Sequence, residues 1–143
     1  MKNGFGCVAS ILCGLVLGVG GVSTAVAQTT MERMAQEAAA ELASTLPMRV
    51  NQNLTIQTVF AEGRMVMATA MFSYTKADLD AVLAQGGKNN QEAIAHMRNS
   101  ARGGVCIPGA PLRRFVSLGG TVRYLYRFSD GTTYTVVDVD SCD

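Results

Sequence analysis

The sequence predicts an α+β protein in which an antiparallel β-sheet of about four strands is packed on one face by three to four helices and held by one disulfide. Two pairs of segments with alternating apolar residues, each pair joined at a glycine-containing turn, predict the sheet. Three segments with apolar residues at helical spacing behind a capping residue predict the helices. No repeat or linker interrupts residues 28–143, which we expect to form a single domain.

The first 27 residues have the features of a secretory signal peptide. Lys2 supplies the positive charge, no charged residue follows as far as Gln28, and residues 11–19 form a compact apolar run. The small-x-small sequence ending at Ala27 predicts cleavage between Ala27 and Gln28. We therefore expect a protein of the periplasm, or a secreted one, whose mature form does not span the membrane. Retention of the segment as an anchor is the alternative.

Composition excludes several classes of function. The chain has 12 Lys+Arg and 11 Asp+Glu, and removal of Lys2 with the signal segment would balance them. A balanced chain has no overall field that attracts nucleic acid, so we expect no nucleic-acid partner. With 48% hydrophobic residues the chain can bury a core and is not a disordered tail.

Cleavage of the predicted signal segment would remove two of the four cysteines, Cys7 and Cys13, and leave Cys106 and Cys142. In an oxidising compartment such a pair most simply forms a disulfide. It would close a loop of about 36 residues and stabilise the fold by about 3–4 kcal/mol. Redox catalysis would call for a Cys-x-x-Cys motif, and a metal site would need more ligands than these two thiols and a distant histidine.

Capping residues place the helices. Thr29 with Glu32 and Asn89 with Glu92 have the spacing of capping boxes, and Thr75 has Asp78 at the same distance. Pro47 ends the first helix, and Gly-Gly pairs end the others. The predicted helices cover residues 29–46, 75–85, 89–102 and, as a short fourth one, 111–118.

Two hairpins make the sheet. Strands over 54–61 and 64–73 meet at Glu62-Gly63, and strands over 121–129 and 132–140 meet at Asp130-Gly131, which favours a type I′ turn. In the first hairpin, alternation places six residues on one face: Leu54, Ile56, Phe60, Met65, Met67 and Met71. In the second hairpin it places Arg123 opposite Asp138 and Arg127 opposite Tyr134 on the outer face, with Tyr124 and Tyr126 on the other.

No catalytic motif emerges. His96 is the only histidine, and Ser100, one helical turn away, is a common neighbour rather than part of a triad. The carboxylates fall at helix starts or opposite arginine, and no glycine pair has phosphate-loop spacing. We therefore expect no enzymatic activity, no catalytic residue and no cofactor.

Two features favour a binding role. Met65, Met67 and Met71 share a strand face, which is typical of core packing or of a peptide-binding surface. A Cu(I) site is the alternative that we disfavour, so we expect no metal. Six arginines and no acidic residue lie between Glu92 and Asp130, and Arg113-Arg114 fall beside two prolines in or near a loop. This pair could contact an acidic partner, or the arginines could simply be dispersed over the surface.

The C-terminal pattern resembles a known family. Cys106, Gly119-Gly120, the run from Val122 to Arg127, Asp130-Gly131 and Cys142 resemble the closing half of the β-type pilotins of type II secretion. The resemblance implies a small periplasmic α/β protein that binds the C-terminal segment of an outer-membrane secretin. Those pilotins are lipidated, whereas Cys13 follows Leu12 and does not form a lipobox.

These observations predict a periplasmic, non-enzymatic binding protein, either pilotin-like or an accessory factor of a secretion or transfer system. Its partner would be a protein, such as a secretin or another envelope component. A small secreted inhibitor or immunity-type protein is the alternative, because such proteins are also small, secreted and disulfide-bonded.

Overall fold

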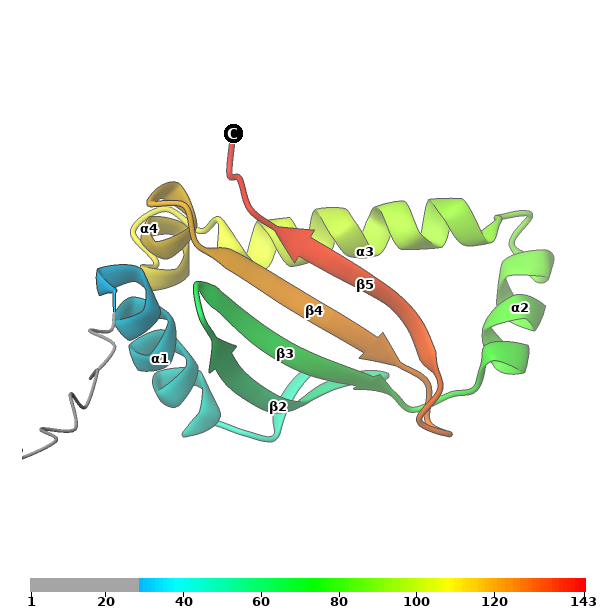
Figure 1. The fold of residues 1–143 in the computed structure, drawn as a ribbon. Helices are drawn as coiled ribbons and strands as arrows, with labels where there is room; N and C mark the ends of the chain where they lie inside the picture. The colour runs from blue at the N-terminus through cyan, green and yellow to red at the C-terminus, as the bar shows by residue number, and fades with distance from the viewer. Residues whose placement is uncertain (1–28) are drawn as a thin grey trace, which may run out of the picture.

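A computed structural model of the chain describes residues 29–143, which form five strands and four helices (Figure 1). The predicted signal segment and its cleavage site at Ala27 and Gln28 lie outside the described residues. The helices are α1 (Thr30–Ala43), α2 (Lys76–Gln85), α3 (Asn90–Val105) and α4 (Pro111–Ser117). The strands are β1 (Met48–Asn51), β2 (Leu54–Glu62), β3 (Met65–Phe72), β4 (Thr121–Arg127) and β5 (Thr133–Val139).

The strands form one sheet in the order β1-β2-β3-β4-β5, which confirms the predicted α+β class. Two details differ from the prediction. The sheet has five strands rather than about four, because β1 is only four residues long and too short to show alternation. β3 and β4 are parallel, with Met65 opposite Thr121 and Met71 opposite Arg127. α2, α3 and α4 lie between them in the chain, and parallel neighbours need such a long crossover.

The two faces of the sheet differ in burial. Along β3 every second residue is buried, from Val66 to Phe72. This inner face packs against α1 and α4, whose buried side chains include Ala35, Ala39 and Phe115. The opposite, outer face carries Met65, Met67 and Met71, none of which belongs to the buried core cluster. The predicted methionine face is therefore the outer face.

The first hairpin turns one residue later than predicted. Glu62 pairs with Met65, so Gly63-Arg64 form the turn. Gly63 has φ = +55°, a conformation that glycine adopts at little steric cost.

A β-bulge between Ile56 and Thr58 changes which residues of β2 face the core. The bulge adds one residue to the strand, and side chains alternate along a strand, so it moves Leu54 and Ile56 to the inner face. The prediction that these two share the methionine face was therefore wrong, whereas Phe60, beyond the bulge, does lie opposite Met67.

The second hairpin has the predicted register over most of its length, with Arg123 opposite Asp138. The register shifts near the turn, so that Arg127 pairs with Thr133 instead of Tyr134. The turn is longer than two residues, because the Phe128 amide donates to the Thr132 carbonyl at 2.9 Å. Tyr134 consequently lies on the inner side, where its ring centroid is 5.0 Å from that of Phe128.

All three predicted N-terminal caps form reciprocal capping boxes, at Thr29, Thr75 and Asn89. The third helix was predicted to end before Gly103, but α3 continues through both glycines to Val105. Glycine inside a helix costs about 1 kcal/mol, and the complete burial of Val105 offsets part of that cost.

The predicted disulfide between Cys106 and Cys142 is present. The two Cα atoms are 5.5 Å apart and the bridge spans 36 residues of sequence. It joins the C-cap of α3 to the segment after β5, and so attaches the helix to an edge of the sheet. None of the helices in residues 29–143 is both long and apolar enough to cross a membrane.

Candidate functional site: an apolar groove

An apolar groove of about 920 Å³ lies on the inner face of the sheet. The sheet forms its floor, and side chains of α1, α2 and α3 form its sides. α3 runs along β5, and α2 lies at the end of the sheet where β3 ends and β5 begins (Figure 1). The volume is within the range of ligand-binding pockets, and the groove therefore offers room for a partner.

Small residues on both sides make the groove hollow. Ala68 and Ala70 of β3 line the floor, and Ala101 and Gly104 of α3 line the side that faces it. A Cβ atom at Gly104 would meet nothing within 4 Å. Interiors of proteins are normally filled to crystal-like density, so the missing side chains leave space that the chain does not fill itself.

Tyrosines form the aromatic part of the lining. Tyr124 and Tyr126 are neighbours on the inner face of β4, with ring centroids 6.0 Å apart. Tyr74 stacks on Phe72 at 4.8 Å. Burial raises the pKa of Tyr74, of Tyr124 and, to about 12, of Tyr126. Their hydroxyls therefore stay protonated at physiological pH and can donate hydrogen bonds.

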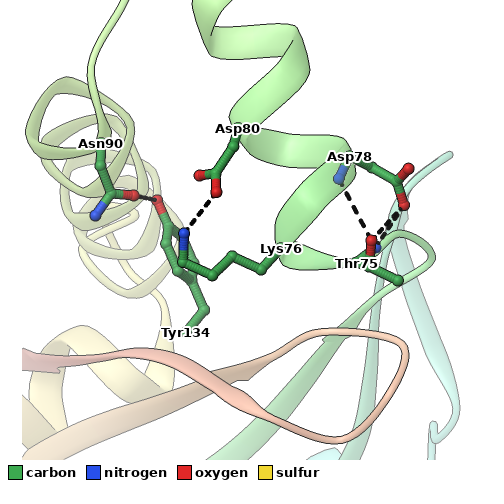
Figure 2. A network of polar contacts seen from close by, with 6 residues as sticks. All are labelled: Thr75, Lys76, Asp78, Asp80, Asn90 and Tyr134. Carbon is green, nitrogen blue, oxygen red and sulfur yellow. Dashed lines mark hydrogen bonds and ion pairs between the residues drawn. The ribbon is translucent and has the colours of Figure 1, made fainter.

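A polar network lies at the α2 end of the groove (Figure 2). The Tyr134 hydroxyl donates a 2.7 Å hydrogen bond to Asn90 Oδ1, which connects β5 to the start of α3. On α2, Lys76 Nζ donates to Asp80 at 2.6 Å.

α2 itself packs loosely. It has no buried residue, and its Val82 is 64% exposed. Leu79 and Leu83 are only partly buried and line the groove. These apolar side chains of α2 are therefore available to a partner.

The groove holds no recognisable catalytic or metal-binding set. His96 and Ser100 of α3 are both exposed residues of the lining, and no hydrogen bond joins them. Within residues 29–143, no group of three or more His, Cys, Asp or Glu side chains could hold a metal ion. The arrangement supports binding of apolar groups, with hydroxyl donors among them.

The methionines and arginines that the sequence predicted for partner binding lie outside the groove. Met65, Met67 and Met71 are on the outer face, where Met67 lies in a row with Phe60 and Arg123. Their role as a binding surface remains a prediction.

Arg113 and Arg114 lie in α4 rather than in a loop. Arg113 is half-buried and its Nη1 donates to the Cys106 carbonyl at 3.1 Å. Arg114 is exposed. The geometry therefore gives Arg113 a structural contact and leaves Arg114 as the member of the pair that faces solvent.

Sequence reasoning did not identify the groove. Alternation placed Tyr124 and Tyr126 on the correct face of β4, but it did not indicate that this face borders an open groove. Whether facing residues meet or leave a gap depends on the distance between α3 and the sheet, and no local pattern encodes that distance.

Comparison with solved structures finds proteins that share this fold. The pilotin EpsS of the Vibrio vulnificus type 2 secretion system is similar over 81% of this chain and 94% of its own, with a TM-score of 0.60 and 21% identity. The type II secretion system pilotin AspS from Vibrio cholerae is similar over 78% and 90%, with a TM-score of 0.57 and 20% identity.

A third similar structure, from Pseudomonas aeruginosa, is described as that of a secreted protein. It matches over 78% of this chain and 89% of its own, with a TM-score of 0.58 and 14% identity. No protein-family model and no curated protein sequence matches the chain. At these identities the comparisons establish a shared fold, and they agree with the resemblance to pilotins found in the C-terminal sequence.

Proposed function

We propose that the protein is a periplasmic, non-enzymatic binding protein that serves as a pilotin-like accessory of a secretion or transfer system. The observation that carries this proposal is the apolar groove on the inner face, on a fold shared with two type II secretion pilotins. By this proposal the groove receives an apolar segment of a partner, such as a secretin or another envelope component.

A helix suits this groove better than an extended segment. β2, β3 and β4, which form the floor, each have strand neighbours on both edges, so their backbone groups are already paired. An extended peptide would leave its own backbone donors and acceptors unpaired against apolar side chains, which is costly. A helix satisfies these groups internally and presents side chains alone. The proposed occupant is therefore an amphipathic helix with its apolar face in the groove.

The envelope location rests on the predicted cleavage between Ala27 and Gln28. Intact-mass measurement of the protein released from the periplasm tests it, and the expected species begins at Gln28. A species that retains Met1 would contradict the location proposed here and favour an anchored form.

A matched pair of methionine variants tests the groove. Met97 lines the groove, whereas Met67 lies on the outer face, and both are half-buried. The measurement is cross-linking in cells followed by purification and mass spectrometry of the bound envelope proteins. We expect a secretin or another secretion-machine component to be recovered with the natural protein and with Met67→Lys, and to be lost with Met97→Lys.

The opposite result, loss with Met67→Lys alone, would assign binding to the outer methionine face. Recovery of a hydrolase or a toxin in place of a secretion component would favour the inhibitor or immunity-type alternative. Circular dichroism of both variants confirms that each is folded before its binding is interpreted.

A further inference from the structure

The tyrosine hydroxyls in the groove restrict which side chains a partner can place beside them. The inference drawn from them rests on the function proposed above. Of the four tyrosines in its lining, Tyr134 has a protein partner for its hydroxyl, Asn90. Among residues 29–143, the hydroxyls of Tyr74, Tyr124 and Tyr126 have none, and Tyr124 and Tyr126 are neighbours on β4. Tyr126 is nevertheless only 4% exposed, and both side chains line the groove.

An unpaired donor restricts what can fill the space next to it. In the empty groove, water can accept from these hydroxyls. A partner that displaces this water without replacing its hydrogen bonds loses affinity, because the donors are left unpaired in an apolar environment. A tyrosine hydroxyl can both donate and accept; burial raises the pKa of both groups, so each keeps its proton, and that proton needs an acceptor. The partner must therefore bring an acceptor to this part of the groove.

We propose that the helix bound in the groove carries one hydrogen-bond acceptor side chain, Gln, Asn, Glu or Asp, within its apolar face, and that Tyr124 and Tyr126 select it. The chemistry resembles that of enzymes that recognise a substrate hydroxyl, where a buried polar group in the site rejects analogues that lack its counterpart. The pair would let the groove reject purely apolar helices, such as membrane-spanning segments, that a hydrophobic surface alone would also bind.

A peptide library tests this selectivity directly, because the measurement needs no natural partner. The probe is a displayed library of amphipathic helical peptides of about 16 residues, long enough for about four turns. Positions on its apolar face vary among Leu, Ile, Phe, Ala, Gln and Glu. We expect selection on the natural protein to enrich apolar residues together with Gln or Glu at one position. Selection on the double variant Tyr124→Phe, Tyr126→Phe should enrich apolar residues at that position instead.

Fluorescence anisotropy then measures the selected peptide against its counterpart with Leu in place of the acceptor. The Leu peptide should bind the natural protein about tenfold more weakly, the size expected for one hydrogen bond. The double variant should bind both peptides equally. Tyr134→Phe is the matched control, because its hydroxyl already bonds to Asn90, and it should keep the tenfold difference.

Three outcomes would overturn the inference. In the first, selection enriches peptides with wholly apolar faces, and these peptides do not bind Met97→Lys. That result would support the groove as the binding site but contradict the need for an acceptor side chain. Equal discrimination by the double variant would assign the selectivity to other residues. Displacement of the peptide by palmitate at equal concentration would identify an acyl chain as the occupant. Enrichment of no helical peptide at all would instead contradict the proposed function itself.

Discussion

The hydroxyl of Tyr134 in β5 donates a 2.7 Å hydrogen bond to Asn90 Oδ1 at the start of α3, 44 residues earlier in the chain. This bond ties the N-terminal end of α3 to the sheet beside α2, which has no buried residue of its own. The bond therefore anchors the start of α3 to β5.

Tyr134→Phe removes this bond and keeps the ring that packs on Phe128 and Phe72. We expect a loss of about 1 kcal/mol in the free energy of unfolding, the usual contribution of one hydrogen bond. Chemical denaturation measures the loss, and hydrogen exchange should quicken in α2 and the first turns of α3. Tyr124→Phe is the control, because its hydroxyl has no protein partner among the described residues, and an equal loss there would contradict the interpretation.

Removal of the disulfide should destabilise the fold. For Cys106→Ala with Cys142→Ala, we expect about 3–4 kcal/mol less stability, from the loop of 36 residues that the bridge closes. Urea denaturation of the oxidised protein and the double variant checks this. Titration of the natural protein in denaturant without reductant should find no free thiol on these two residues, and two free thiols would contradict the bridge.

Two glycine-to-alanine changes should have opposite signs. A Cβ at Gly120 would lie 2.4 Å from the ring of Phe115, which is 1% exposed and cannot move outward freely. Gly120→Ala should therefore cost about 1–3 kcal/mol. A Cβ at Gly103, in α3, meets nothing within 4 Å, so Gly103→Ala should add up to about 1 kcal/mol. Thermal melts compare the two, and destabilisation by Gly103→Ala would be the contrary result.

Acid should weaken the fold through three aspartates. Hydrogen bonds from Thr75, Thr132 and Arg123 lower the pKa of Asp78, Asp130 and Asp138, respectively. Because each folded pKa lies below the unfolded value, the stability gained is fully present above about pH 4 and is lost as the pH falls through the folded pKa values.

We therefore expect the melting temperature to fall with pH below about 4. Melts of the natural protein between about pH 2 and pH 6 measure the slope, and Asp138→Asn should make it shallower. A melting temperature that rose on acidification would contradict the assignment.

The two neighbouring arginines should respond differently to charge reversal. Arg114 is exposed, so Arg114→Glu should leave stability nearly unchanged and weaken binding of an acidic partner in a salt-dependent way. Arg113 donates to the Cys106 carbonyl, and Arg113→Glu should also cost about 1 kcal/mol of stability. Binding measured at low and high salt, beside melts of each variant, separates the two effects. Unchanged partner binding in Arg114→Glu would remove this residue from the interface.

Much of the local structure could be predicted because its causes lie within a few residues. Thr29 and Glu32 are three residues apart, so the capping box that begins α1 depends only on residues close together in the chain. The alternation in β4 and β5 likewise predicted the pairing of Arg123 with Asp138, because opposite charges and apolar faces agreed on one register. The bridge between Cys106 and Cys142 followed from there being two cysteines after the predicted leader.

Other features depended on residues far apart in the chain. β3 and β4 pair in parallel because the three helices between them bring the chain back to the edge of β3 in the same direction. The bulge before Thr58 turns the side chain of Ile56 to the opposite face of the sheet. α3 passes through Gly103 to Val105, whose complete burial offsets part of the cost of glycine inside the helix.

The groove is the clearest case of a feature that tertiary structure creates. The order of residues alone implies that Tyr124 and Tyr126 share one face of a strand, because side chains alternate along a strand. Only the tertiary packing left an open groove that Ala68, Ala70 and Gly104 all line. Alternation predicts which way a side chain points. Whether side chains fill the space between a helix and the sheet depends on the distance between them, and that distance is set by contacts over the whole chain.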